Sequence, residues 1–433
     1  MEKNYQTSNE LLERAKRVTP VAAQTYSKSY RYFCEGNSPL FLEEGEGCYV
    51  WDVDGNKFVD FICALGAITV GYNDKRVNKA IMRQLEKGIS FSQPTEIEVE
   101  LAEKLIDIIP CAEMVKFVKN GSDATASAIR LARAYTGKEL FAVCGYHGMD
   151  DWYIGTTVNN LGVPKAVRKQ GINFEYNNIE SLKKIFDENP NKIAAIILEP
   201  IQANGPEKGF LEEVAEIADN NGAVLIFDEV VSGFRYALGG ASEMYNVVPD
   251  IAAIGKGMGN GLAISAVVGR KDLLELIETK NVFISTTFGG ETLSIAGALE
   301  TINILEQSGV YHEIWRLGEI MLEGLRKNIA KYGLNDVIKV SGLAPHSGVI
   351  FEGKGSLDYL DIQSVFSQRM TENGILTLGI NNLSTAHTEK EIKMFVDSSG
   401  QAMEDVKKAI EQDSVEGILK GKKVNPVFKR NIK

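Results

Sequence analysis

Several features that would place the chain in other protein classes are missing. The 433 residues contain no apolar run near the length of a membrane span, so we expect no membrane partner. The formal net charge of −11 argues against nucleic acid or an anionic membrane surface as a partner. Only five cysteines occur, without CxxC spacing, and they predict reduced, mostly buried thiols in a cytoplasmic protein. The polar residues 1–6 predict no secretory signal.

Motifs of several common site types are also absent. The histidines have no metal-ligand spacing, so no metal site is predicted; they are His147, His312, His346 and His387. Residues 223–229 end in two acids after an apolar run, as in nucleoside triphosphatases, but no GxxxxGK[ST] loop accompanies them. The glycines at 255–261 lack the G-x-G-x-x-G spacing of a dinucleotide site, and there is no GxSxG elbow.

What is present is a long chain of ordinary globular composition, with 44% apolar and 24% charged residues. Its length exceeds one ordinary core, so we expect a large domain and a smaller one. Strand and helix patterns alternate from residue 114 to 268, which predicts an α/β fold with a mainly parallel sheet. We expect an N-terminal segment with a small antiparallel sheet over 1–70, a large domain over 71–308 and a small α+β domain over 309–433.

Individual elements follow from apolar periodicity and from the residues that start and stop helices. The expected strands of the large sheet are 115–118, 140–143, 193–198, 224–227, 251–254 and 263–268. The expected helices are 8–18, 75–87, 96–109, 122–136, 179–189, 211–220, 291–307 and 389–412. In the helix 122–136, the stripe expected to be buried runs to Tyr135.

The prediction of a functional site starts from one lysine. Lys256 follows the apolar run 251–254 in a loop with glycine at 255, 257, 259 and 261. Alone, it would be interpreted as a surface turn residue. A buried-strand pattern at 223–227, however, closes on Asp228, and ligands of open α/β sheets bind at such strand ends. A lysine and an acid at adjacent strand ends suit pyridoxal 5′-phosphate, which needs a Schiff-base lysine and a carboxylate for its ring nitrogen.

Polar residues follow three further strands of the predicted sheet. Gly121 and Ser122 open a helix and predict an anion site; the alternative is an ordinary cap by Asn120 or Ser122. Tyr146 lies between glycines and can stack on a cofactor ring; the alternative is a core tyrosine beside a structural His147.

Glu199 ends the strand 193–198, and Asn204 lies in the loop beyond it. Polar groups at a third strand end strengthen the prediction of a pocket along this edge of the sheet. Taken individually, Glu199 fits a purely structural role as well as a role in this pocket.

The motifs together resemble one family. The chain carries, in order, Gly121-Ser-Asp, Tyr146-His-Gly, Glu199-Pro, Asp228-Glu-Val, Gly255-Lys-Gly and Ser285-Thr-Thr-Phe-Gly-Gly. From about residue 30 to 410 it resembles the class III pyridoxal-phosphate aminotransferases, of fold type I. Residues 228–241 and 386–389 are similar to the glutamate-1-semialdehyde aminomutase group within that class.

The resemblance implies roles for five residues around the cofactor ring. Lys256 would form the Schiff base, and Asp228 would pair with the ring nitrogen. Val230 and Tyr146 would lie on opposite faces of the ring, and Asn204 would reach its hydroxyl.

The resemblance also implies a phosphate site and a shared active site. Gly121 and Ser122 would bind phosphate, and Thr287 would complete that site from the neighbouring subunit of a homodimer. Three further side chains are predicted to contact substrate: Arg31, Glu199 and His147.

The sequence departs from the aminomutase pattern at 65–67, 286–292 and 346–351. Residues 145–155 and 287–292 look more like relatives that aminate carbonyl sugars or other polyol-like ketones and aldehydes. We therefore predict transfer of an amino group from an amino acid, glutamate by preference, to a small carbonyl acceptor such as a keto or aldehydo sugar. The alternatives are a glutamate-1-semialdehyde 2,1-aminomutase and a non-catalytic sugar-binding protein that keeps the fold.

Overall fold

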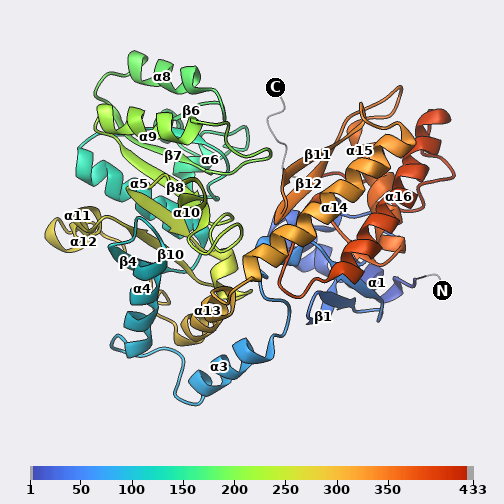
Figure 1. Ribbon diagram of the computed structural model, residues 1–433, viewed down its shortest axis with the longest axis horizontal. Helices are drawn as coiled ribbons and strands as arrows, with labels where there is room; N and C mark the ends of the chain where they lie inside the picture. The colour runs from blue at the N-terminus through green and yellow to red at the C-terminus, as the bar shows by residue number, and fades with distance from the viewer. Residues whose placement is uncertain (1–2, 427–433) are drawn as a thin grey trace. The chain divides into compact units, whose positions relative to one another are not determined.

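The computed structural model describes residues 3–426, and the chain divides into two compact units (Figure 1). Unit 1 comprises the described residues of Met1–Gly66, Val70–Asp74 and Gly309–Arg430, and unit 2 comprises Ala67–Thr69 and Lys75–Ser308. The functional domains 1–70, 71–308 and 309–433 stay a prediction. Their residues 1–2 and 427–433 lie outside the described part of the chain.

Unit 2 is built on a seven-stranded sheet of order β4-β10-β9-β8-β7-β5-β6. The strands are β4 (Met114–Val118), β5 (Leu140–Cys144), β6 (Gly171–Asn173), β7 (Ile193–Leu198), β8 (Val224–Glu229), β9 (Ile251–Ile254) and β10 (Ser265–Gly269). Only β10 runs against its neighbours, β4 and β9, and the other pairs are parallel. The predicted α/β fold with a mainly parallel sheet is confirmed.

Helices cover both faces of this sheet. They are α3 (Lys75–Leu85), α4 (Glu96–Ile108), α5 (Gly121–Thr136), α6 (Asp151–Ile154), α7 (Lys165–Arg168), α8 (Ile179–Glu188), α9 (Phe210–Asn220), α10 (Gly240–Tyr245), α11 (Lys271–Leu274), α12 (Leu276–Thr279) and α13 (Thr292–Leu305). Alternate residues of one strand enter different cores: Ile197 packs in the core that includes α5, and Ile196 in the core that includes α8 and α9. Strands buried on both faces explain why their sequences are continuous apolar runs.

The helix α5 differs from its prediction at one position. Ala124, Ala128, Leu131 and Ala132 are buried as expected, but Tyr135 is 46% exposed. Its hydroxyl accepts a hydrogen bond of 3.2 Å from Arg270 Nη2. A tyrosine at the end of an amphipathic stripe can keep its polar tip in water, and here that preference decides its position.

In the described part of the chain, unit 1 contains two smaller sheets and five α-helical elements. The first sheet has the order β1 (Leu42–Glu46), β2 (Tyr49–Asp52), β3 (Lys57–Asp60) and β13 (Ile375–Leu376), and the second the order β11 (Ile338–Leu343), β12 (His346–Phe351) and β14 (Ile380–Asn382). The helices are α1 (Gln6–Val18), α2 (Cys63–Gly66), α14 (Val310–Tyr332), α15 (Tyr359–Glu372) and α16 (Glu389–Glu411). Apolar residues of α14, α15 and α16, such as Leu325, Phe366 and Phe395, form its core.

The short element α2 is a left-handed turn. Its backbone φ angles are 48° at Cys63, 50° at Ala64, 62° at Leu65 and 82° at Gly66. The left-handed conformation costs each non-glycine residue about 1–2 kcal/mol. Local bonds offset part of this, because Cys63 Sγ donates to the Asn382 carbonyl at 3.2 Å and Gly66 N donates to the Ile62 carbonyl at 3.2 Å.

Three findings bear on the absences noted in the sequence. All five cysteines are free and buried, as predicted. Among the described residues, no group of histidine, cysteine and acidic side chains could hold a metal ion. A search of that same part of the chain finds no helix whose length and apolar content would let it cross a membrane.

Candidate active site

The carboxyl ends of adjacent parallel strands bring polar residues into one row. In the sheet register, Leu198 of β7 pairs with Cys144 of β5 on one side and with Phe227 of β8 on the other. The residues that follow these three partners are Gly145, Glu199 and Asp228. Glu199 and Asp228 therefore lie at the same level of the sheet, on neighbouring strands.

Lys256 enters the same edge from the next strand. Glu229 of β8 pairs with Ile254 of β9, and Lys256 follows two residues later. Burial lowers the pKa of its amine, and the nearby carboxylates of Glu199 and Asp228 oppose that shift. The lysine and the aspartate singled out in the sequence are thus neighbours at adjacent strand ends.

Asp228 is held from behind by a buried histidine. Its Oδ2 lies 2.8 Å from His147 Nδ1, and its Oδ1 accepts a 3.1 Å hydrogen bond from the Val230 amide. His147 is only 2% exposed, and its Nε2 lies 3.1 Å from the Cys144 carbonyl. Both ring nitrogens therefore contact protein groups, while the ring stacks on Trp152 at a centroid distance of 6.2 Å.

Glu199 is hydrogen-bonded to the loop that contains Tyr146. Its Oε2 accepts a 2.8 Å hydrogen bond from the Tyr146 amide. Burial raises the pKa of the Glu199 carboxyl, and the negative charge of Asp228 raises it further. The Tyr146 side chain is 53% exposed, and its ring meets the edge of Tyr153 at 5.6 Å. Tyr146 is therefore not a core residue, and the alternative of a core tyrosine is wrong.

The N-terminus of α5 combines a cap with close backbone approaches. Asn120 is the N-cap residue of α5, and its backbone N–H donates to Asp123 Oδ2 at 2.8 Å. The interpretation of Asn120 as an ordinary helix cap is therefore correct. A Cβ atom on Gly121 would lie 2.9 Å from Val230 Cγ1, and one on Gly148 would lie 2.4 Å from Ser122 Oγ. The first amides of a helix lack intrahelical acceptors, so Gly121 and Ser122 begin a helix end that can receive an anion.

One polar residue of this edge was missed in the sequence. Gln202 Nε2 lies 3.4 Å from Cys144 Sγ, and a Cβ atom on Gly145 would approach it to 3.0 Å. Asn204, which the sequence singled out in the same loop, is exposed. Gln202 follows Glu199 by three residues, and this short distance along the chain is what could have indicated that it lies near the site. Asn204 lies in the same loop and is an equally plausible polar contact from sequence alone.

Two other predicted residues come from other segments of the chain. Thr287 is exposed in the chain between α12 and α13. Arg31 belongs to unit 1, in a short 3-10 turn, Tyr30–Tyr32, whose carbonyl at Arg31 accepts a 2.8 Å bond from the Asn425 amide. Their predicted roles, on phosphate and on substrate, stay predictions.

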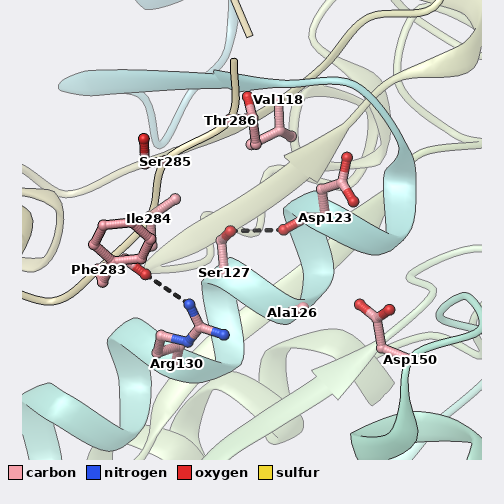
Figure 2. Close-up of a pocket in the computed structure, with 10 residues that line it drawn as sticks. All are labelled: Val118, Asp123, Ala126, Ser127, Arg130, Asp150, Phe283, Ile284, Ser285 and Thr286. Carbon is pink, nitrogen blue, oxygen red and sulfur yellow. Dashed lines mark hydrogen bonds between the residues drawn. The ribbon is translucent and has the colours of Figure 1, made fainter. Parts of the chain in front are cut away.

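A cavity of about 220 Å³ lies beside α5 (Figure 2). Arg130 Nη1 donates to the Phe283 carbonyl at 2.6 Å, and Ser127 Oγ donates to the Asp123 carbonyl at 2.6 Å. None of the site residues predicted from the sequence lines this cavity.

A mainly parallel α/β sheet with a lysine and acids at adjacent strand ends is typical of an enzyme, and comparison with known proteins identifies the family. Residues 32–389 match the Aminotransferase class-III family, and the chain belongs to that family. The predicted aminotransferase, with pyridoxal 5′-phosphate as its cofactor, is confirmed at this level.

Individual relatives cover nearly the whole chain. The glutamate-1-semialdehyde 2,1-aminomutase of Syntrophobacter fumaroxidans is 35% identical, over 92% of this chain and 98% of its own. The 3-aminobutyryl-CoA aminotransferase of Cloacimonas acidaminovorans is 34% identical, over 93% and 98%. Among solved structures, the pyridoxal-phosphate form of the FumI protein of Sphingopyxis sp. MTA144 superposes with a TM-score of 0.85 at 26% identity, over 93% of this chain and 97% of that one.

The residues present fit this cofactor. The edge offers a buried primary amine at Lys256 and a carboxylate at Asp228 whose second oxygen is held by the Val230 amide. It also offers a helix N-terminus at Gly121, where the absence of a Cβ lets the backbone pack closely against Val230 and the first amides of the helix can receive an anion. An amine, an acid and an anion site are the three groups that pyridoxal 5′-phosphate requires.

Proposed function

We propose that this enzyme transfers the amino group of an amino acid to a small carbonyl acceptor, at a site built on Lys256 and Asp228. The observation that carries the proposal is the position of the buried Lys256 amine. It interacts electrostatically with the carboxylates of Glu199 and Asp228, which lie at adjacent strand ends. Bound pyridoxal 5′-phosphate supplies an electron sink for the pair released when a C–H bond breaks.

Each central residue has one proposed task. Lys256 would hold the cofactor through Nζ and, as a neutral amine, would take the proton from the Cα of the donor. Asp228 keeps the ring nitrogen protonated, so developing negative charge is stabilised. His147 is proposed to orient Asp228 rather than to touch substrate, because both of its ring nitrogens face protein atoms.

The other assignments extend the same arrangement. Gly121 and Ser122 bind phosphate with the first amides of α5, and Val230 and Tyr146 cover the two ring faces. Asn204 is proposed for the ring hydroxyl, with Gln202, whose Nε2 lies 3.4 Å from Cys144 Sγ, as the alternative. Thr287 acts from a second copy of the chain in a homodimer, which works in the cytoplasm.

We further propose glutamate as donor and a polyol-like ketone or aldehyde as acceptor, with Glu199 and Arg31 as candidate substrate contacts. The second candidate function is that of an aminomutase, which moves the amine within one molecule. It is supported by the relative of that name at 35% identity. Glutamate labelled with ¹⁵N separates them, because a transaminase passes the label to its product and an aminomutase does not.

The test of the common core is Lys256→Ala, compared with Lys280→Ala at an exposed position. Loss of the nucleophile and proton carrier should reduce turnover by more than roughly a thousandfold. The visible absorbance that the wild type shows after incubation with the cofactor should vanish in Lys256→Ala, and Lys280→Ala should match the wild type. Normal turnover in Lys256→Ala would end the proposal.

A further inference from the structure

A three-residue segment of the N-terminal chain lies against the lysine loop. Ala67–Thr69 belongs to unit 2, although the chain on both sides of it belongs to unit 1. The Thr69 amide donates to Asn260 Oδ1 at 2.9 Å, and Thr69 Oγ1 donates to the Gly257 carbonyl at 2.8 Å. Thr69 is only 2% exposed. One residue thus contacts the loop on either side of Met258, just after Lys256.

The loop that it contacts is strained. Lys256 has a φ of 35° and Asn260 a φ of 44°, in the left-handed region that residues with side chains rarely adopt. Such a conformation persists only where the surroundings impose it. Within the loop itself, the Met258 amide donates to the Gly255 carbonyl at 3.0 Å, and the Leu262 amide donates to the Gly259 carbonyl at 3.0 Å. The Gly257 carbonyl instead receives its bond from Thr69.

The fit between the two segments is close. A Cβ atom on Gly257 would lie 2.9 Å from Thr69 Cγ2, and one on Gly261 would lie 2.9 Å from Ile68 Cδ1. Arg235 Nη2 donates to the Ile68 carbonyl at 3.4 Å, which fixes the segment from its other side. The segment also begins directly after the left-handed turn Cys63–Gly66, so its path has little freedom.

From these contacts we infer that Thr69 is a positioning residue, which holds the backbone of Lys256 in its strained conformation and so aims the amine. Thr69 touches the loop and not the reacting atoms. Its effect on rate rests on the proposed function, whereas its effect on the loop does not.

The test compares three variants of the full-length protein as purified with its cofactor. Thr69→Val removes the hydroxyl and keeps the shape, and Thr69→Ser keeps the hydroxyl. Thr385→Val is the matched control, because Thr385 Oγ1 also donates to a backbone carbonyl, that of Val70 at 3.2 Å, within unit 1.

Hydrogen exchange of the amides of residues 257–261 is the first readout. Loss of one neutral hydrogen bond should speed it roughly fivefold in Thr69→Val. Exchange in Thr69→Ser and Thr385→Val should match the wild type. Equal exchange in Thr69→Val and the wild type would overturn the inference. If Thr69→Val does not fold, Thr69→Ala removes the same hydroxyl and gives the same comparison.

Steady-state kinetics is the second readout. In Thr69→Val, kcat should fall by a similar factor with KM for both substrates unchanged, because Thr69 does not meet substrate. Faster exchange with unaltered kcat would show that Thr69 stabilises the loop without orienting the Lys256 amine. That result would also overturn the inference. Absence of transamination in the wild type would refute the proposed function, while the exchange result would still decide whether Thr69 holds the loop.

Discussion

His147 Nδ1 lies 2.8 Å from Asp228 Oδ2, in a pair that is almost fully buried. The carbonyl of Cys144, at the end of strand β5, lies 3.1 Å from the other ring nitrogen. The acid is therefore oriented by a side chain that is itself oriented by the sheet. We expect the position of the Asp228 carboxylate to depend on this arrangement.

Replacing His147 should reduce activity without removing the cofactor. His147→Phe removes a hydrogen bond to a charged group, typically about 1.5–3 kcal/mol, so kcat should fall roughly ten- to a hundredfold. His147→Asn can place an amide donor near the Nδ1 position and should recover part of the rate. The exposed His312→Asn is the control. Equal rates in His147→Phe and the wild type, measured with saturating cofactor, would contradict the orienting role.

Gly121→Ala should weaken cofactor binding through a steric conflict. The new methyl group would lie 2.9 Å from Val230 Cγ1, and overpacking of this kind costs about 1–3 kcal/mol. The dissociation constant of pyridoxal 5′-phosphate, measured by equilibrium titration, should rise accordingly. Gly121→Ala should lower the affinity less in a Val230→Ala background than in the wild type, because Val230→Ala removes the atoms that the new methyl group would meet. Gly400→Ala in α16, whose methyl group would lie 3.4 Å from Asn328, should leave the affinity unchanged. An equal loss of affinity in both backgrounds would show that the conflict is not with Val230.

The pH dependence of cofactor attachment follows from Lys256. Burial lowers the pKa of its amine below the usual 10.5, so the neutral, nucleophilic form persists to a lower pH than in an exposed lysine. The rate at which cofactor-free protein takes up pyridoxal 5′-phosphate should rise with pH and level off below that value. Glu199→Gln removes a charge that raises the pKa, so its midpoint should be lower still. Stopped-flow absorbance measures both, and a midpoint at or above 10.5 would be inconsistent with the buried amine.

Glu229→Gln should destabilise unit 2. The Glu229 carboxylate is buried and accepts bonds from the amides of Ala241 and Ser242, both at 2.8 Å, and from the hydroxyls of Ser232 and Ser242. An amide nitrogen in place of one oxygen would face donors, at a cost of about 1–3 kcal/mol for each group left unpaired. Urea unfolding should show this loss in Glu229→Gln and almost none in the exposed Glu212→Gln. Equal midpoints would mean that these donors find other acceptors.

The long elements of this fold could be predicted because one physical signal dominates each. β7 and β9 are apolar throughout, and both were predicted at their observed bounds, since strands covered on two faces need apolar side chains at every position. The four-residue helices α6, α7, α11 and α12 were not predicted, because elements this short take their shape from tertiary contacts.

The site divides in a similar way. Lys256 and Asp228 could be found because strand ends and glycines mark them. The placement of His147 behind Asp228 could not, since it depends on the register of β5, β7 and β8, which no local pattern encodes. Gln202 was missed for the same reason. The left-handed turn at Cys63–Gly66 contains three residues with no intrinsic preference for that conformation, so only the surrounding bonds reveal it.

The reversed direction of β10 has a consequence for how this chain can be lengthened. Residues 255–264 join two antiparallel neighbours, β9 and β10, as a wide hairpin, whereas other links in the sheet travel through helices. A crossover helix can absorb an inserted residue by shifting along its axis. The two strands that flank this hairpin are paired with each other, so their ends are fixed. An inserted residue would therefore displace Lys256. Length variation in this part of the molecule should therefore accumulate in the helical links and spare the hairpin.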